Sequence, residues 1–322
     1  MTTFLTVAKP SEKIESKSST ETMSTAYDAN VPVWEIGDQW IYKIDNISIN
    51  NQTESKTINL FLKIAELPLT VISTIGDFYT LTFTTNVSGQ GKIYSDQGDG
   101  PVNISITFTN ISLSGNVIIE KSTLGIKEIS VAFSKEKFLV DIIDQPFFKL
   151  PRILQKISAK ITMNMTTTFD TPFSLLTFPL STLLVWNSTA TNFTINGKIQ
   201  CLWLNLINFL NKMAKLAGNE FLDPDVAALL PVLDIKEALT TLGNGNVFQT
   251  PAISDAFFCL NTENITVPAG LYYAYNITLI GGLAQCFYAP TAGNVIKING
   301  NLEEIIPYLK GINMELLSTN YS

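Results

Sequence analysis

Alternation of apolar and polar residues constrains the fold of this chain more than any other feature of its sequence. Between residues 157 and 169, for example, Ile157, Ala159, Ile161 and Met163 are each followed by a polar residue. Similar runs recur from residue 40 onwards and again at 271–279. A period of two is typical of strands with one buried and one solvated face, and many such strands in series indicate an antiparallel sheet. The run at 157–169 would extend about 43 Å, which favours a large, curved sheet.

The spacing of apolar residues becomes helical between residues 200 and 243. Gly218 is a plausible helix end, and Asp223 followed by Pro224 is a typical helix start. We therefore predict a mainly β (α+β) fold. It is a large curved antiparallel sheet, or half-barrel, with apolar helices from about 200–243 covering the concave face. A further short helix is predicted at 302–309.

The domain organisation follows from composition along the chain. Residues 1–30 are rich in Ser, Thr, Lys and Glu and contain few large apolar residues, which predicts a disordered stalk or lead-in. Residues 31–322 are predicted to form a single β-rich domain with the helical insertion at 200–243. The lead-in could donate a strand to a neighbouring molecule, so self-association through the N-terminal segment is a predicted interaction.

Composition excludes several classes of function. The chain has no histidine, which removes Ser-His-Asp and Cys-His catalysis and imidazole-bound zinc. A single arginine, Arg152, and a net charge of −7 disfavour nucleic acid as a partner. The segment Asp96–Gly100 resembles part of a calcium loop but lacks the spacing of an EF-hand. We predict a non-enzymatic protein with no cofactor and no metal; a hydrolase that uses two carboxylates is the remaining enzymatic alternative.

Glycosylation signals are about twice as frequent as chance would give, with 11 Asn-x-Ser/Thr sequons against roughly 5 for random placement. The predicted sites are Asn46, Asn51, Asn86, Asn103, Asn110, Asn164, Asn187, Asn192, Asn264, Asn276 and Asn320. They predict an exported glycoprotein with N-linked glycans. The alternative is that a β protein rich in Asn and Thr creates sequons by accident.

No segment is predicted to cross a membrane as a helix. The longest candidate, Cys201–Gly218, contains three asparagines and two lysines. The N-terminus lacks the basic start and apolar stretch of a signal peptide. With the sequons, this predicts an extracellular or cell-surface protein whose signal is absent from this sequence.

The three cysteines, Cys201, Cys259 and Cys286, match no zinc or redox spacing. In an exported protein we predict a disulfide between Cys259 and Cys286, which flank a compact β segment, and a buried Cys201. The alternative is that all three are reduced.

The apolar residues of the helical region are the predicted ligand contacts, because a large sheet closed by apolar helices can enclose a cavity. They are Trp203, Leu206, Phe209, Leu210, Met213, Leu229, Leu230 and Leu233. The alternative is a filled core.

Three motifs carry a resemblance to known proteins. They are Trp34-x-x-Gly-Asp-x-Trp-x-Tyr42, Thr266-Val-Pro-Ala-Gly-Leu-Tyr272 and the segment 287–298 that begins Phe-Tyr-Ala-Pro. The set resembles uncharacterised secreted or envelope proteins of archaea and bacteria with a fold similar to LolA/LolB-like lipoprotein carriers. The resemblance implies a curved antiparallel sheet with helices over its concave face, and an apolar or lipid ligand.

Two functions are expected from these observations. The first is a non-enzymatic, exported cell-surface glycoprotein that shelters an apolar ligand or lipid between sheet and helices. The alternative is a structural or adhesive envelope protein with a filled core, either surface-layer-associated or a filament subunit.

Overall fold

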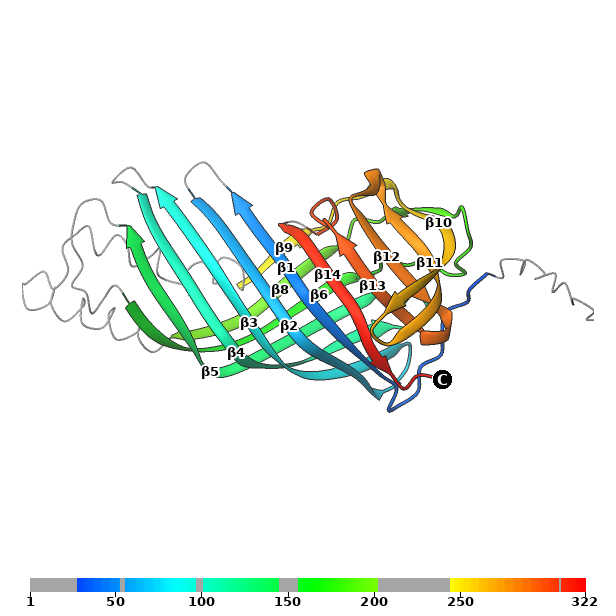
Figure 1. Ribbon diagram of the computed structural model, residues 1–322, viewed down its shortest axis with the longest axis horizontal. Helices are drawn as coiled ribbons and strands as arrows, with labels where there is room; N and C mark the ends of the chain where they lie inside the picture. The colour runs from blue at the N-terminus through cyan, green and yellow to red at the C-terminus, as the bar shows by residue number, and fades with distance from the viewer. Residues whose placement is uncertain (1–27, 53–55, 97–100, 145–155, 202–243, 307) are drawn as a thin grey trace, which may run out of the picture.

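A single antiparallel sheet of fourteen strands makes up nearly all of the computed structural model (Figure 1). The model describes residues 28–52, 56–96, 101–144, 156–201, 244–306 and 308–322. The strands are β1 (Gln39–Gln52), β2 (Lys56–Ser73), β3 (Phe78–Asp96), β4 (Pro101–Glu120), β5 (Ile126–Asp144), β6 (Lys156–Phe173), β7 (Val185–Ser188), β8 (Asn192–Cys201), β9 (Asn244–Gln249), β10 (Ile253–Val267), β11 (Gly270–Leu279), β12 (Ala284–Ala289), β13 (Asn294–Gly300) and β14 (Leu309–Thr319). The predicted large antiparallel sheet is therefore confirmed, and the run at 157–169 lies in β6.

The two ends of the sheet are joined. The strand order is β7-β10-β11-β12-β13-β14-β1-β2-β3-β4-β5-β6-β8-β9. The β8–β9 ladder continues past its last pair through Thr191 and Thr250, where the Thr250 N–H donates to the Thr191 carbonyl at 2.9 Å. The same two chain segments then pair again as β7 and β10, beginning with Ser188 opposite Ile253. The sheet thus encloses an inner face.

The predicted helical component is wrong for the described residues. They contain no α-helix, only two short 3₁₀ turns, η1 (Ile280–Gly282) and η2 (Pro290–Ala292). Gln200 and Cys201 end strand β8, so no helix begins at 200. The remainder of the predicted insertion, residues 202–243, lies outside the described residues.

The predicted helix at 302–309 is also wrong. The N–H of Ile305 donates to the Leu302 carbonyl at 2.9 Å, which closes a turn, and Leu309 already begins β14. Residues 303–305 form a single turn, and eight residues are too few for a helix to be stable without further packing.

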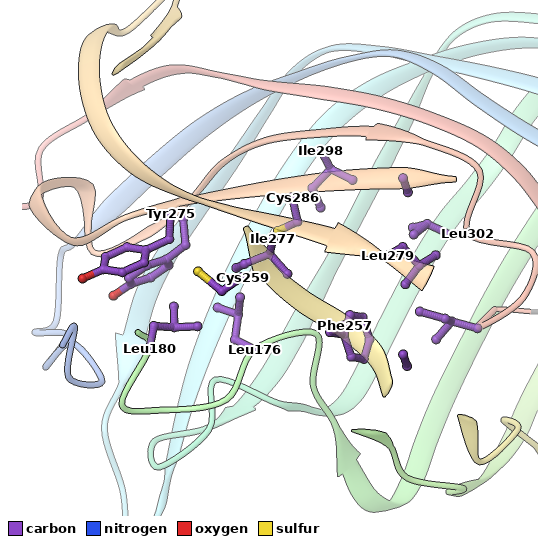
Figure 2. Packing of buried hydrophobic residues seen from close by; sticks show 14 of the residues in the cluster. Leu176, Leu180, Phe257, Cys259, Tyr275, Ile277, Leu279, Cys286, Ile298 and Leu302 are labelled. Atoms are coloured by element: carbon purple, nitrogen blue, oxygen red, sulfur yellow. The ribbon is translucent and has the colours of Figure 1, made fainter. Parts of the chain in front are cut away.

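A first cluster of buried side chains fills the interior between β10–β12 and the segment 174–184 (Figure 2). Leu176 and Leu180 of that segment pack against Phe257, Cys259 and other strand residues. Ala29 belongs to the same cluster and pairs with Leu180 as an isolated bridge. The packed part of the chain therefore begins before the boundary predicted at residue 31. The rest of the predicted lead-in, residues 1–27, lies outside the described residues.

A second cluster brings together the three motifs that carry the sequence resemblance. The Trp34 indole N–H donates to the Gly293 carbonyl at 2.9 Å, and that of Trp40 donates to the Ala292 carbonyl at 2.6 Å. The Ala269 N–H, at the tip of the β10–β11 hairpin, donates to the Leu316 carbonyl at 3.1 Å. Gly293 has φ of 60°, the left-handed conformation that its turn position predicts. The motifs are therefore elements of one packing unit.

A third cluster lies where a line of register irregularities crosses the sheet. They occur after Ile44 in β1, after Ile64 in β2, after Val87 in β3, at Asn110 in β4 and after Phe133 in β5. The buried members of the third cluster are Ile44, Ile64, Val87, Phe108, Ile111, Phe138, Ala159 and Ile161. Because bulges bend a strand, their alignment curves these strands around the cluster.

Candidate functional site

The inner face beyond the third cluster is apolar but only half-buried on several strands. There, β1, β3 and β5 end, while β2, β4 and β6 begin. We call this part of the sheet the far half, and the part that holds the first two clusters the near half. The half-buried apolar side chains of the far inner face are Ile47, Ile49, Ile58, Leu60, Leu62, Ile93 and Ile106.

Register places these side chains next to one another. Ile47 is opposite Leu62 and Ile49 is opposite Leu60, and cross-strand partners project to the same face. Leu60 is in turn opposite Gly91, which is opposite Ile106. The far inner face is therefore one continuous apolar surface.

In the middle of β3, two glycines contribute no side chain to this apolar surface. Gly89 is opposite Leu62 and lies under the Phe108 ring, because a Cβ there would meet Phe108 Cζ at 2.5 Å. At Gly91 a Cβ would have ordinary contacts, the nearest with Leu60 Cδ1 at 3.4 Å. Of the two positions, Gly91 is thus the one where the inner face leaves room for a methyl group.

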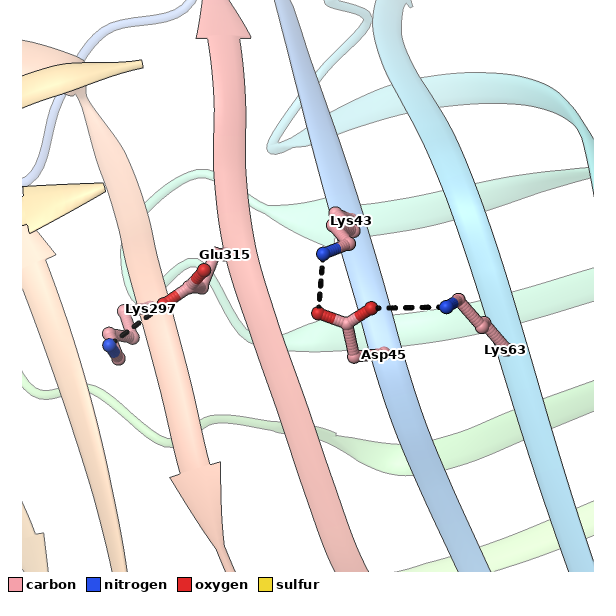
Figure 3. A network of polar contacts seen from close by, with 5 residues as sticks. All are labelled: Lys43, Asp45, Lys63, Lys297 and Glu315. Atoms are coloured by element: carbon pink, nitrogen blue, oxygen red, sulfur yellow. Dashed lines mark ion pairs between the residues drawn. The ribbon is translucent and has the colours of Figure 1, made fainter. Parts of the chain in front are cut away.

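The outer face of the same strands is polar. Lys43, Asp45 and Lys63 form ion pairs across β1 and β2, with Nζ–O distances of 2.7 and 3.6 Å to Asp45 (Figure 3). The hydrogen bond from Lys43 lowers the pKa of the Asp45 carboxyl. Lys297 pairs with Glu315 at 2.8 Å. Elsewhere the outer positions of β3, β4 and β6 carry mostly Thr, Ser and Asn, so the two faces differ sharply in polarity.

The near half, in contrast, is filled. The void among Leu175, Phe257, Ile277 and neighbouring residues of the first cluster measures about 10 Å³, enough for one water molecule at most. The space for an apolar ligand, if the protein binds one, is therefore not within the first cluster.

The predicted ligand contacts from Trp203 to Leu233 lie outside the described residues. The structure therefore places none of these eight side chains. The apolar residues that it does place on an inner face come from the alternating strands, which the sequence analysis identified as sheet but did not assign to a ligand.

The predicted glycosylation sites differ in their accessibility. Seven are exposed: Asn46, Asn86, Asn110, Asn164, Asn187, Asn264 and Asn320. Asn51, Asn103 and Asn192 are half-buried. Asn276 is only 4% exposed, and its side-chain amide donates to the Glu263 carboxylate at 2.7 Å. Asn276 therefore offers no free amide for a sugar in the folded protein.

The predicted disulfide between Cys259 and Cys286 is wrong, because both thiols are free. Cys259 is opposite Ile277, and Ile277 is opposite Cys286, so the two cysteines stand two strands apart on one face. Two strand spacings are about 9.6 Å, whereas a disulfide needs Cα atoms within about 7 Å. Burial raises the pKa of the Cys259 thiol to about 11 and that of Cys286 to about 12.

One residue on the inner face escaped the sequence analysis. Glu136 of β5 is opposite Ile161, which is buried in the third cluster, and it shares the alternation of Phe138 and Val140. An acid on the apolar side of an alternating run was the signal that could have revealed it.

Other chemistry has no support among the described residues. They contain no group of three or more acidic or cysteine side chains placed to hold a metal ion. No helix within them is long and apolar enough to span a bilayer. No family model, curated protein or solved structure matches this chain.

Proposed function

We propose that the protein is a non-enzymatic, exported cell-surface glycoprotein that holds an apolar ligand, such as a lipid, against the far inner face of its sheet. The observation that carries the proposal is the difference in side-chain burial between the inner faces of the far and near halves. Leu60, Leu62 and their neighbours are apolar but half-buried, whereas Leu180 and Tyr288 in the near half are fully buried.

The free-energy cost of leaving apolar side chains partly in water supports this proposal. Each large apolar side chain left partly in water forgoes part of the roughly 1.5–3 kcal/mol that full burial contributes. The joined ends of the sheet, β7–β10 and β8–β9, lie in the near half, which is filled. The far inner face keeps an apolar lining on β1–β4 that suits an apolar occupant.

The export and glycosylation part of the proposal depends on the seven exposed sequon asparagines and on the outer face. The outer face is made polar mainly by Thr, Ser and Asn side chains, and glycans would add solubility. The resemblance to LolA/LolB-like carriers agrees with an apolar ligand and belongs to the same proposal. Expression in a glycosylating host, followed by peptide mass spectrometry, tests it: sugars on Asn46, Asn86 or Asn164 are expected, and a fully unmodified secreted protein would contradict it.

Ligand binding is tested with a neutral fluorescent probe, N-phenyl-1-naphthylamine, together with native mass spectrometry of protein purified without detergent. We expect probe fluorescence to rise on binding, and Leu60→Asp to weaken binding at least tenfold. Phe61→Asp is the matched control, because Phe61 is the next residue on β2 and is 44% exposed on the outer face.

Equal effects of the two substitutions would contradict binding at the far inner face. Absence of both probe binding and any bound mass would instead favour the alternative of a structural or adhesive envelope protein. Circular dichroism of each variant establishes that it is folded.

A further inference from the structure

Glu136 introduces a carboxylate into the apolar lining of the sheet. Lys137 and Leu139 of the same strand are exposed, whereas Phe138 and Val140 are buried, so Glu136 has the inner parity. Its partner in β6, Ile161, is 5% exposed and belongs to the third cluster. Partners across a ladder project to the same face, which directs the Glu136 side chain inward.

Two aromatic residues flank this carboxylate in the strand. Phe133 is the preceding inner residue and Phe138 the following one, and their ring centroids lie 5.6 Å apart. Phe108 of β4 adds a third ring, 5.0 Å from that of Phe138. Phe108 and Phe138 are each 8% exposed, so these rings form a packed apolar surface next to Glu136 in the strand.

The ladder between β4 and β5 is interrupted at the same level. β4 and β5 pair up to Thr107–Leu139 and again from Ser114–Ala132, and the residues between are not paired with each other. On its other side β5 stays attached to β6, where the Lys135 N–H donates to Thr162 Oγ1 at 2.9 Å. Glu136 therefore lies beside a break in the β4–β5 ladder.

Among the described residues, Glu136 has no ion-pair partner. The nearby lysines Lys135, Lys137 and Lys160 are exposed, and Lys137 and Lys160 are opposite each other in the outward parity. An ionised carboxylate on an apolar face is costly unless it is paired, and it can only accept hydrogen bonds. A bound ligand that donates from a cationic group would remove that cost.

We propose that the apolar ligand carries an alkylammonium head group, which binds the Glu136 carboxylate at the edge of the third cluster. The inference depends on the proposed ligand-binding function and narrows its chemistry. The inference concerns the head group only, because the far inner face would hold the apolar chain of a ligand with or without an ammonium group.

The test is displacement of N-phenyl-1-naphthylamine from the full chain by four amphiphiles of equal chain length, each below its micelle concentration. They are dodecyltrimethylammonium, dodecanol, dodecanoate and dodecyl lysophosphatidylcholine. We expect the ammonium compound to bind about tenfold or more tighter than dodecanol, and dodecanoate to bind most weakly. Lysophosphatidylcholine distinguishes a phospholipid from a simple amine, because only a site that also tolerates phosphate would bind it as well as the ammonium compound.

Glu136→Gln is expected to abolish the preference for the ammonium compound over dodecanol. Asp141→Asn is the matched control, because it removes the same charge from the same strand and Asp141 lies on the outer face with Lys156 3.6 Å away. A preference that persists in Glu136→Gln, or equal binding of the ammonium compound and dodecanol by the unaltered protein, overturns the inference. If no amphiphile and no probe binds, the proposed function itself fails. The ranking in the unaltered protein decides the matter even where Glu136→Gln does not fold.

Discussion

The near and far halves of the sheet share one sequence pattern but differ in how their inner faces are covered. In the near half, Trp40 and Tyr288 are fully buried beneath segments that are not strands, such as 174–184 and η2. In the far half, Leu60 and Leu62 carry the same apolar parity and remain half-buried. Alternation therefore determines that an inner face exists, and in the near half the segment 174–184 and η2 help to fill it.

Removal of a near-half aromatic should have the largest effect on stability. Trp40 is 0% exposed, its ring centroid lies 4.7 Å from that of Trp34, and its indole N–H donates to the Ala292 carbonyl. Trp40→Ala is expected to lower the free energy of unfolding by about 3–5 kcal/mol, measured by urea denaturation. In the far half, Leu62→Ala should cost less, about 1–2 kcal/mol, because part of the Leu62 side chain is already exposed in the folded protein.

Trp40→Phe serves as the milder variant if Trp40→Ala does not accumulate in folded form. Similar losses for Trp40→Ala and Leu62→Ala would show that the far half is as tightly filled as the near half, and the comparison between them would not hold.

The glycines of β3 allow a smaller and more local test. A Cβ at Gly89 would approach Phe108 Cζ at 2.5 Å and the Phe61 carbonyl at 2.6 Å. Gly89→Ala should therefore destabilise by about 1–3 kcal/mol. Gly91→Ala, two residues along the same strand, should be neutral or slightly stabilising, because its Cβ has room and glycine is unfavourable in strands.

Thermal unfolding of the two variants measures the difference. If Gly91→Ala were as damaging as Gly89→Ala, the added methyl group would have to meet its neighbours more closely than the 3.4 Å expected to Leu60 Cδ1.

The sheet was predictable from the sequence because alternation is a local signal. The run at 157–169 identified β6, and the Trp34 and Gly293 motifs marked positions that the second cluster uses. The helix at 302–309 was mispredicted because a short apolar run has no decisive period, and strand pairing with β13 and β1 prevailed from Leu309 onward.

The candidate site was less predictable than the fold. Which inner positions are covered depends on contacts between segments distant in sequence, such as Leu180 with Ala29. The disulfide was mispredicted because closeness in sequence does not determine which strands are neighbours. Strand β11, with Ile277 opposite both cysteines, lies between the strands of Cys259 and Cys286. An acid on the apolar side of an alternating run was visible at Glu136 in the sequence. Its importance became clear only when the pairing of β5 with β6 placed it opposite buried Ile161.

Two buried tyrosines of the near half should respond in opposite directions to loss of the hydroxyl. The Tyr42 hydroxyl donates to the Val295 carbonyl at 2.8 Å, whereas the Tyr288 hydroxyl is buried with no partner. Tyr42→Phe should cost about 1 kcal/mol, and Tyr288→Phe should be neutral or stabilising by about 1 kcal/mol. Urea denaturation of both variants gives the sign, and a clear loss for Tyr288→Phe would mean that its hydroxyl has a partner.

The smallest expected effect concerns the two buried thiols of the first cluster. In a Cys201→Ser background, a reducing agent should leave the melting temperature unchanged, because Cys259 and Cys286 are two strands apart and unbonded. A disulfide closing that loop would contribute roughly 3–4 kcal/mol, so its loss would be obvious. The raised thiol pKa values, about 11 and about 12, also predict negligible reaction with a thiol reagent at pH 8 until the protein unfolds. Rapid labelling of the folded protein would show that the first cluster opens readily, and would remove the basis for treating the near half as the closed part of the molecule.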